Sequence, residues 1–247
     1  PGFHGAGKGG LEYAIESNGP LTFYLLLSSQ HRFARGASIV PLMVGPIHLV
    51  NKPQPGWNTN LPLESWPDIP STAHDTYRLL ENVVVHETWD AGIPGKIWDS
   101  ALVMLDFIKK QQPYWQNLHV IDLSAGTGLL GIYLGKLGIQ ATITELDDAV
   151  NLIYENKALN GDPSAVNVKP LLWGDESQAA ACGKADIIVA SDVLYETEFF
   201  EDLAQALVHL CKPTTVIYIG YKRRGLDNSD EERFWSLCRA RGFDISV

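Results

Sequence analysis

The chain has 247 residues, a length that fits one large α/β domain or one domain with an appendage. Hydrophobic residues make up 45% and charged residues 19%, which excludes a wholly disordered chain, a collagen and a small disulfide scaffold. The net charge of −10 falls entirely on residues 81–247, because residues 1–80 carry five basic and five acidic side chains. Since an acidic field repels phosphate backbones, we expect a basic protein surface as the partner and no nucleic acid.

Cysteine usage and apolar runs indicate the compartment. The cysteines, Cys182, Cys211 and Cys238, are too few and too scattered for a disulfide framework or a metal knuckle, so we expect no metal and a reducing, cytoplasmic location. The apolar stretches 21–27 and 37–50 are shorter than the roughly 18 residues needed to span a bilayer. We therefore expect core strands there, no membrane partner, and a monomer.

The N-terminal third lacks a regular pattern. Residues 1–10 are glycine-rich and are predicted to be a flexible end or a remnant without chemistry. Residues 46–70 are rich in proline, which disfavours helix and central strand alike and predicts a long irregular connection. We expect residues 1–80 to form a β-rich extension and residues 81–247 to form the main domain.

Regular alternation begins after residue 82. A β-branched run predicts a strand over 83–89, and helical spacing of apolar residues predicts a helix over 96–109. Further strands are expected over 119–123, 141–145, 166–173, 186–190, 215–221 and 243–247, with helices over 129–137, 149–160, 198–211 and 230–241. This βα alternation predicts a doubly wound, mostly parallel sheet covered by helices on both faces. Ligands bind such sheets at the carboxyl ends of the strands.

The clearest local motif is VIDLSAGTGLLG over residues 120–131. It places Gly126, Gly128 and Gly131 in a GxGxxG pattern directly after a predicted strand, and Glu145 ends the next strand 19 residues after Gly126. The glycines permit a tight turn and close approach of a ligand, and the carboxylate can bind both hydroxyls of a ribose. The pattern predicts a site for an adenosine-containing cofactor, although a glycine-rich turn without a ligand can look the same.

Two cofactor classes share this geometry. A nicotinamide dinucleotide places its pyrophosphate on the helix N-terminus, whereas a sulfonium cofactor needs an acid to orient its cationic amino acid part. Asp122, two residues before Ser124, is placed for that role and would repel a pyrophosphate. We therefore favour S-adenosylmethionine.

Two further motifs follow later strands. Trp173 can stack on an adenine, or it can be a core aromatic. Asp192 and Tyr195 are three residues apart and can line one mouth, where a carboxylate and a phenol would receive an amine; alternatively Asp192 is a helix cap.

These motifs together resemble the seven-β-strand protein-lysine methyltransferases of the methyltransferase-like family, whose members act on chaperones and translation elongation factors. The resemblance covers about residues 82–245 and rests on GKIWDSALVMLDFI, VIDLSAGTGLLG, LLWG and SDVLY, in that order. It implies S-adenosylmethionine as cofactor and a protein substrate that presents a lysine. The implied cofactor contacts are Trp98, Ser124, Ala125, Gly126, Glu145, Trp173 and Ser191, with Asp192 and Tyr195 at the substrate lysine.

The chain also departs from the family pattern. Asp122-Leu123-Ser124 stands where the family usually has Glu-Leu-Gly, which predicts weaker cofactor affinity, and no sequence remains after residue 247 for the customary antiparallel seventh strand. A basic run over 222–224 is expected to be solvated, with contact to an acidic substrate segment as the alternative. Methyl transfer to a small molecule, an arginine or a histidine, a nicotinamide oxidoreductase, and a noncatalytic scaffold remain open.

Overall fold

The computed structural model describes residues 22–27, 42–48 and 75–246, with side chains described from residue 76 onward. The expectation for residues 1–10 lies outside the described residues. The expected irregular connection over 46–70 starts later than predicted, because strand β2 continues through Pro46 to His48; its remainder also lies outside the described residues.

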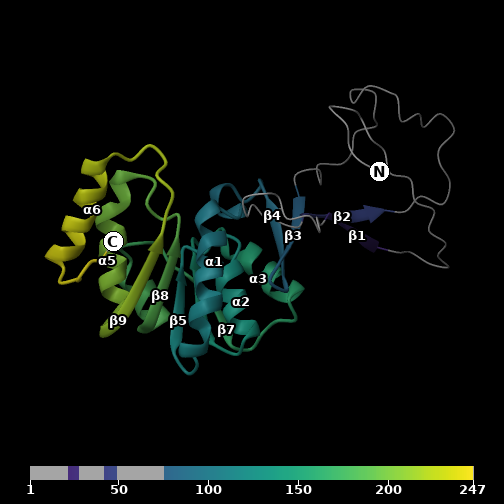
Figure 1. Ribbon diagram of the computed structural model, residues 1–247, viewed down its shortest axis with the longest axis horizontal. Coiled ribbons are helices and arrows are strands. Elements are labelled where there is room, and N and C mark those ends of the chain that lie inside the picture. The colour runs from purple at the N-terminus through teal and green to yellow at the C-terminus, as the bar shows by residue number, and fades with distance from the viewer. Residues whose placement is uncertain (1–21, 28–41, 49–74, 247) are drawn as a thin grey trace.

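A five-stranded parallel sheet forms the centre of the main domain (Figure 1). In order across the sheet, the strands are β7 (Val166–Pro170), β6 (Gln140–Glu145), β5 (His119–Leu123), β8 (Ala185–Ser191) and β9 (Cys211–Gly220). Apolar side chains on both faces explain the central position of β5 and β8, which pair from Val120 with Ile187 to Leu123 with Ala190. The strand order reverses between β5 and β8, which confirms the doubly wound α/β fold.

Helices cover both faces of this sheet (Figure 1). One face is covered by α1 (Asp99–Gln111), α2 (Leu129–Lys136) and α3 (Val150–Leu159), and the other by α4 (Glu176–Cys182), α5 (Phe200–Leu210) and α6 (Asn228–Ala240). Short 3-10 turns occur at Ile93–Gly95, Gln112–Tyr114 and Thr197–Phe199. Because successive strand residues face opposite sides, Val120 joins the core under α1 to α3, whereas Ile121 joins the core under α5 and α6. None of the helices in the described part of the chain is long and apolar enough to cross a membrane.

A second sheet is antiparallel and four-stranded. It contains β1 (Thr22–Leu27), β2 (Leu42–His48), β3 (Asp75–Leu80) and β4 (Val83–Thr88), in chain order. The strands expected within 21–27 and 37–50 are therefore present. In Figure 1, β4 lies beside α3.

Two asparagines, Asn156 of α3 and its C-cap residue Asn160, attach β4 to the helix layer of the parallel sheet. Asn156 Oδ1 accepts a hydrogen bond from the His86 amide at 2.6 Å, and its Nδ2 donates to the His86 carbonyl at 3.0 Å. One helical turn later, Asn160 makes the same pair of bonds to Val84, at 2.9 and 2.7 Å. The two side-chain amides thus satisfy a free edge of β4 as a neighbouring strand would.

Several boundaries differ from those predicted from the sequence. The helix expected from residue 96 starts at Asp99, because Trp98 is extended and occupies the N-cap position. The strand expected over 243–247 is wrong for residues 243–246, which are irregular and follow a turn at residues 241–242. Among the described residues no sixth or seventh strand joins the five-stranded sheet, and the N-terminal strands form their own sheet instead. Strand β3 and helix α4 were not predicted.

Candidate active site

A cavity of about 500 Å³ opens at the carboxyl ends of the central strands, where the strand order reverses. Its walls come from the segment before α1, the loop after β5, the end of β6, and the segments after β7 and β8. The predicted residues that line it are Trp98, Ser124, Ala125, Gly126, Glu145, Trp173, Ser191, Asp192 and Tyr195. Of the residues predicted for the site, Asp122 does not line this cavity.

The loop between β5 and α2 turns sharply under the cavity. Ser124 has a φ of 54° and Gly126 a φ of 58°, both in the left-handed region. A Cβ atom on Gly126 would lie 3.1 Å from the carbonyl oxygen of Pro94, a tight contact, so glycine favours both this φ and the close approach of the loop to the segment before α1. The Ala125 amide donates to the Thr144 carbonyl at 3.0 Å and fixes the loop to β6.

Ser124 stands where the family it resembles usually has glycine. A non-glycine residue in the left-handed region is strained by on the order of 1 kcal/mol. The side chain makes a compensating contact: the Trp173 indole Nε1 donates a hydrogen bond to Ser124 Oγ at 2.9 Å. This bond links the loop after β5 to the segment after β7 and holds the Trp173 ring at the cavity wall.

Glu145 ends β6 and lines the cavity with only 7% of its surface exposed. Its Oε1 accepts from the Gly126 amide at 3.2 Å, and its Oε2 accepts from the Leu146 amide at 2.6 Å. Burial raises the pKa of this carboxyl, and the two backbone hydrogen bonds oppose that rise. Each oxygen retains an acceptor position, so the carboxylate can still bind a pair of hydroxyl groups.

Asp122 differs from the prediction. Its side chain shares the face of β5 with Val120, on which α2 packs, and is 1% exposed. Its Oδ2 accepts from the Gly131 amide in the first turns of α2 at 2.8 Å, and its Oδ1 has no hydrogen-bond partner in the described part of the chain. Burial raises its pKa to about 7, against the opposing effect of the Gly131 bond. Asp122 therefore fixes the loop and the helix from beneath, and it does not contact the cavity.

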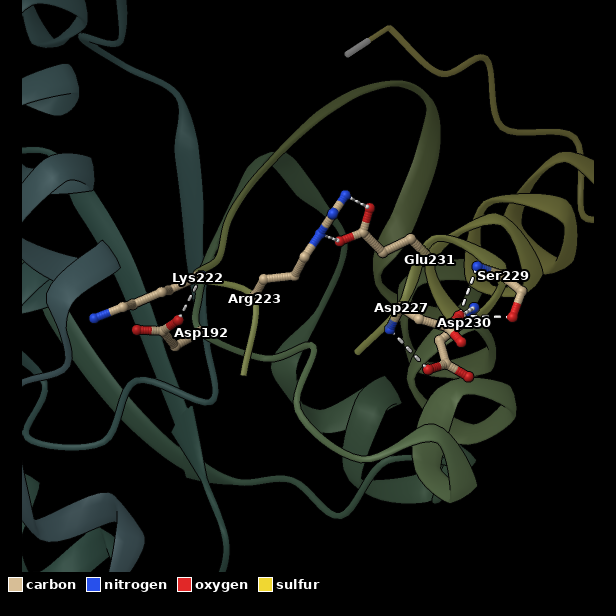
Figure 2. A network of polar contacts seen from close by, with 7 residues as sticks. All are labelled: Asp192, Lys222, Arg223, Asp227, Ser229, Asp230 and Glu231. Carbon is tan, nitrogen blue, oxygen red and sulfur yellow. Dashed lines mark hydrogen bonds and ion pairs between the residues drawn. The ribbon is translucent and has the colours of Figure 1, made fainter. Parts of the chain in front are cut away.

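Asp192 follows β8 with a φ of 56° and has a side chain that is only 5% exposed. Its carboxylate is held from three directions. Oδ2 accepts from the Ser100 amide in the first turn of α1 at 3.2 Å and from Arg224 Nη2 at 3.1 Å, and Oδ1 accepts from the Lys222 amide at 2.9 Å (Figure 2 shows the Lys222 bond). Burial raises the pKa of Asp192, but the hydrogen bonds from Ser100, Lys222 and Arg224 outweigh burial and lower it overall. Asp192 is an anion at neutral pH, and it caps α1 from a distant part of the chain.

Aromatic side chains also line the cavity, among them Trp98, Tyr195 and Phe199. Tyr195 lies beside Phe199, with ring centroids 6.5 Å apart, and burial together with Glu145 and Glu196 raises the pKa of its phenol. Trp98 donates from Nε1 to the Ile93 carbonyl at 3.0 Å. These contacts fix the rings and leave an apolar wall beside the Asp192 carboxylate.

Sequence reasoning missed several residues of the site. The cavity is also lined by Ile93, Pro94, Lys96, Leu146, Leu172, Phe199 and Asp202. Leu146 directly follows the predicted strand 141–145, and Leu172 lies near the end of the predicted strand 166–173; both are exposed apolar residues, and that position is the available signal. Arg224 was expected to belong to a solvated run, but its side chain is 29% exposed and contacts Asp192 and the Trp98 ring.

The open parallel sheet, the glycine-rich turn after its first strand and the acid at the end of the next strand define a Rossmann-like α/β domain with a cavity at its topological switch point. More specifically, the chain belongs to the lysine methyltransferase family, whose sequence profile matches residues 80–240, and it is a methyltransferase.

Named relatives agree with this assignment. Protein N-lysine methyltransferase METTL21A of Mus musculus is 33% identical over 147 residues, which are 58% of this chain and 67% of that protein. EEF1A lysine methyltransferase 3 of Mus musculus is 34% identical over 134 residues, covering 54% of this chain and 57% of that protein. Among solved structures, a SAM-dependent methyltransferase from Agrobacterium tumefaciens shares the fold with a TM-score of 0.51 at 16% identity, over 67% of this chain and 57% of that chain.

Proposed function

We propose that this protein is an S-adenosylmethionine-dependent N-methyltransferase that modifies a lysine side chain of a protein substrate. The observation that carries the proposal is one cavity whose walls combine Glu145 and Trp173 with Asp192 and Tyr195. Membership of the lysine methyltransferase family supports the same activity.

Glu145 and Trp173 fit the cofactor. Glu145 is a nearly buried carboxylate with acceptor positions left for two ribose hydroxyls, and the Trp173 ring is held at the wall for stacking on an adenine. We assign cofactor contacts to Trp98, Ser124, Ala125, Gly126, Glu145, Trp173 and Ser191. When bound, S-adenosylmethionine supplies a methyl group on a positively charged sulfur.

Asp192 and Tyr195 fit an amine. A lysine with its ordinary pKa near 10.4 is protonated and has no lone pair, so the site must receive it, remove it from water and let its proton leave to solvent. Apolar walls and the Tyr195 phenol exclude water and orient the nitrogen, and Asp192 offers an acceptor oxygen. Alignment of the lone pair with the methyl carbon supplies most of the acceleration, so no dedicated general base is required.

The partner and the setting are also proposals. A net charge of −10 and the exposed acids Asp147, Asp148, Glu196 and Glu198 near the cavity favour a basic protein segment around the target lysine. We expect a monomer that acts in the cytoplasm. Because one relative is named as an EEF1A lysine methyltransferase, EEF1A is the first substrate to test.

Two measurements test the function. Calorimetry should show heat on binding of S-adenosylhomocysteine, and tritiated S-adenosylmethionine should label EEF1A or another protein in a fractionated lysate, with mass spectrometry locating the methyl group on a lysine. Label on arginine, histidine or a small molecule would replace the proposed acceptor. A well-folded protein that binds NAD(H) and shows no heat with S-adenosylhomocysteine would overturn the cofactor assignment.

A further inference from the structure

Arg224 lies in the loop between β9 and α6 and contacts two residues that line the cavity, Asp192 and Trp98. Its Nη2 lies 3.1 Å from Asp192 Oδ2, and its Cζ lies 4.8 Å from the centroid of the Trp98 ring. The Arg224 side chain is 29% exposed, compared with 59% for Lys222 and 56% for Arg223. Arg224 thus differs from its two basic neighbours in being partly withdrawn from water and paired with a residue of the cavity.

The loop that carries Arg224 is fixed at both ends (Figure 2). On one side the Lys222 amide donates to Asp192, and on the other the Arg223 guanidinium makes two hydrogen bonds to Glu231 of α6, at 2.6 and 2.7 Å. Figure 2 also shows Asp227 and Asp230 forming the capping box that starts α6. A loop held in this way keeps the guanidinium at a defined place beside the cavity.

The Asp192 carboxylate is nearly saturated by these contacts. Two carboxylate oxygens offer about four acceptor positions in total. Three are used, by the amides of Ser100 and Lys222 and by Arg224 Nη2, and the Ser100 side chain also lowers the Asp192 pKa by hydrogen bonding, so at most one position remains. One acceptor position suits a single N–H of an amine, and it is too few to replace the water shell of an ammonium ion.

The charge of the carboxylate is also balanced. A free carboxylate in a partly buried site would stabilise the ammonium form of an incoming lysine and so hinder the loss of its proton. A guanidinium cannot deprotonate and therefore balances the negative charge of Asp192 at every working pH. A carboxylate whose charge is balanced therefore does not raise the pKa of the incoming lysine, so the lysine can lose its proton.

We propose that Arg224 is a positioning residue for methyl transfer: by pairing with Asp192 it makes that carboxylate a charge-balanced hydrogen-bond acceptor for a neutral amine, and prevents it from trapping an ammonium ion. This inference rests on the proposed function, because it assigns a task within the acceptor site. It gives Arg224 no contact with the reacting atoms.

The other charged groups around this site do not replace Arg224. The cavity itself contributes Lys96, Glu145, Tyr195 and Asp202. Lys96 lies over the Trp89 ring at 4.6 Å, and Glu145 is bonded to its own loop. At the mouth, Lys222 Nζ pairs with Asp99 at 2.7 Å, and Asp99 lies 3.7 Å from Arg224. Asp99 is 63% exposed, so it screens the guanidinium less than Asp192 does.

The affinity for a small amine tests the Arg224–Asp192 pair without a protein substrate. With S-adenosylhomocysteine bound at pH 7, n-butylammonium represents the lysine side chain, and its affinity is measured by calorimetry or NMR titration. We expect Arg224→Gln to bind n-butylammonium at least threefold more tightly than the wild type, because the Asp192 charge is then unbalanced. The Asp192→Asn and Arg224→Gln double variant should return to the wild-type affinity, since both partners are then neutral.

Matched variants distinguish the loss of the Arg224–Asp192 pair from a general change in local electrostatic potential or in folding. Lys222→Gln removes one positive charge from the same loop and keeps the backbone bond to Asp192, so its n-butylammonium affinity should stay within twofold of the wild type. Arg224→Lys keeps the charge and should also resemble the wild type. Equal effects of Lys222→Gln and Arg224→Gln, or no tightening in Arg224→Gln while the double variant folds normally, would overturn the inference.

Turnover provides the second readout. On the lysine-containing protein labelled by the wild type, the rising limb of kcat with pH should move to higher pH in Arg224→Gln and stay in place in Lys222→Gln. A limb that stays in place in folded Arg224→Gln contradicts the inference. Failure of the proposed function has a different signature, namely a wild type that labels no lysine at all, and the n-butylammonium titration does not depend on that result.

Discussion

At the scale of single residues, two buried carboxyl groups end adjacent strands and have different tasks. Glu145 faces the cavity, whereas Asp122 lies under the loop with one oxygen unpartnered among the described residues. The motif identified both as functional because it fixes their place at strand ends. It could not distinguish them, because the direction of each side chain depends on which helix packs on that face of the sheet.

Asp122 makes the stability of the fold depend on pH. Its pKa is raised by burial from 3.8 to about 7, so the folded protein binds a proton more tightly than the unfolded chain. The contribution of Asp122 to the free energy of unfolding should therefore be largest at the acidic end of this window and fall as the pH rises from about 4 to about 7, by at most roughly 4 kcal/mol. Glu145, whose pKa is also raised, contributes with the same sign.

Asp122→Asn tests this assignment, since the amide keeps an acceptor for the Gly131 amide and cannot ionise. Urea unfolding should show a flatter pH dependence than the wild type and a higher free energy of unfolding at pH 8. Glu145→Gln serves as the comparison with a cavity carboxyl. An unchanged slope in Asp122→Asn would mean that Asp122 titrates normally.

Glu145 and Asp192 should separate binding from transfer. Glu145→Ala removes the acceptors for two hydroxyls, so S-adenosylhomocysteine should bind about 30-fold more weakly, which corresponds to roughly 2 kcal/mol. Asp192→Ala should abolish methyl transfer and leave S-adenosylhomocysteine affinity nearly intact. Because Asp192 also caps α1 and holds the β9–α6 loop, we expect this variant to lose about 1–3 kcal/mol of stability. If Asp192→Ala kept most of the wild-type rate, its assigned role would be wrong.

At the scale of elements, periodicity predicted the strands and helices of the main domain, because each buries a face with its own repeat. Helix α4 escaped notice since it has only seven residues and an alanine-rich sequence. The start of α1 was placed too early because capping by Asp192, which lies 92 residues from Ser100, leaves no local signal. The pairing of Asn156 and Asn160 with β4 is hidden for the same reason: it joins residues 70 and 76 positions apart.

These asparagines predict a graded pair of variants. Asn156 is fully buried and, besides holding β4, donates to the Thr127 carbonyl in the loop between β5 and α2 at 3.0 Å. Asn160 holds β4 and makes no bond to that loop among the described residues. We expect Asn156→Ala to lose about 2–4 kcal/mol of stability and to weaken S-adenosylhomocysteine binding. Asn160→Ala should destabilise the protein without that loss of affinity. Equal affinities in the two variants would show that Thr127 does not need this support.

At the scale of the whole molecule, the position of the domain boundary remains a proposal. Strand β3 pairs with β4 over six residue pairs from Asp75 with Thr88 to Leu80 with Val83. Arg78 also forms an ion pair with Glu87, whose side chain is 2% exposed and accepts from the Ile97 amide at 2.9 Å. A boundary after residue 80 would separate these partners, so we propose that the main domain starts before β3.

Two truncations test this boundary. A fragment of residues 75–247 should unfold cooperatively with a midpoint near that of the full chain. A fragment of residues 82–247 loses the β3 edge and leaves Glu87 buried without its cation, which should lower the free energy of unfolding by about 3 kcal/mol or more. Equal stability of the two fragments in urea would support the boundary predicted from the sequence.

The hydrogen bond between Trp173 and Ser124, together with the position of Trp98, has a practical consequence. Two indole rings face the same 500 Å³ space from opposite parts of the chain. Because the sequence holds seven tryptophans, the signal of these two rings is obtained by difference: the emission change on ligand binding that is lost in Trp173→Phe belongs to Trp173, and the change lost in Trp98→Phe belongs to the ring on which Arg224 stacks. The pair of variants would thus follow the two parts of the site without an added dye.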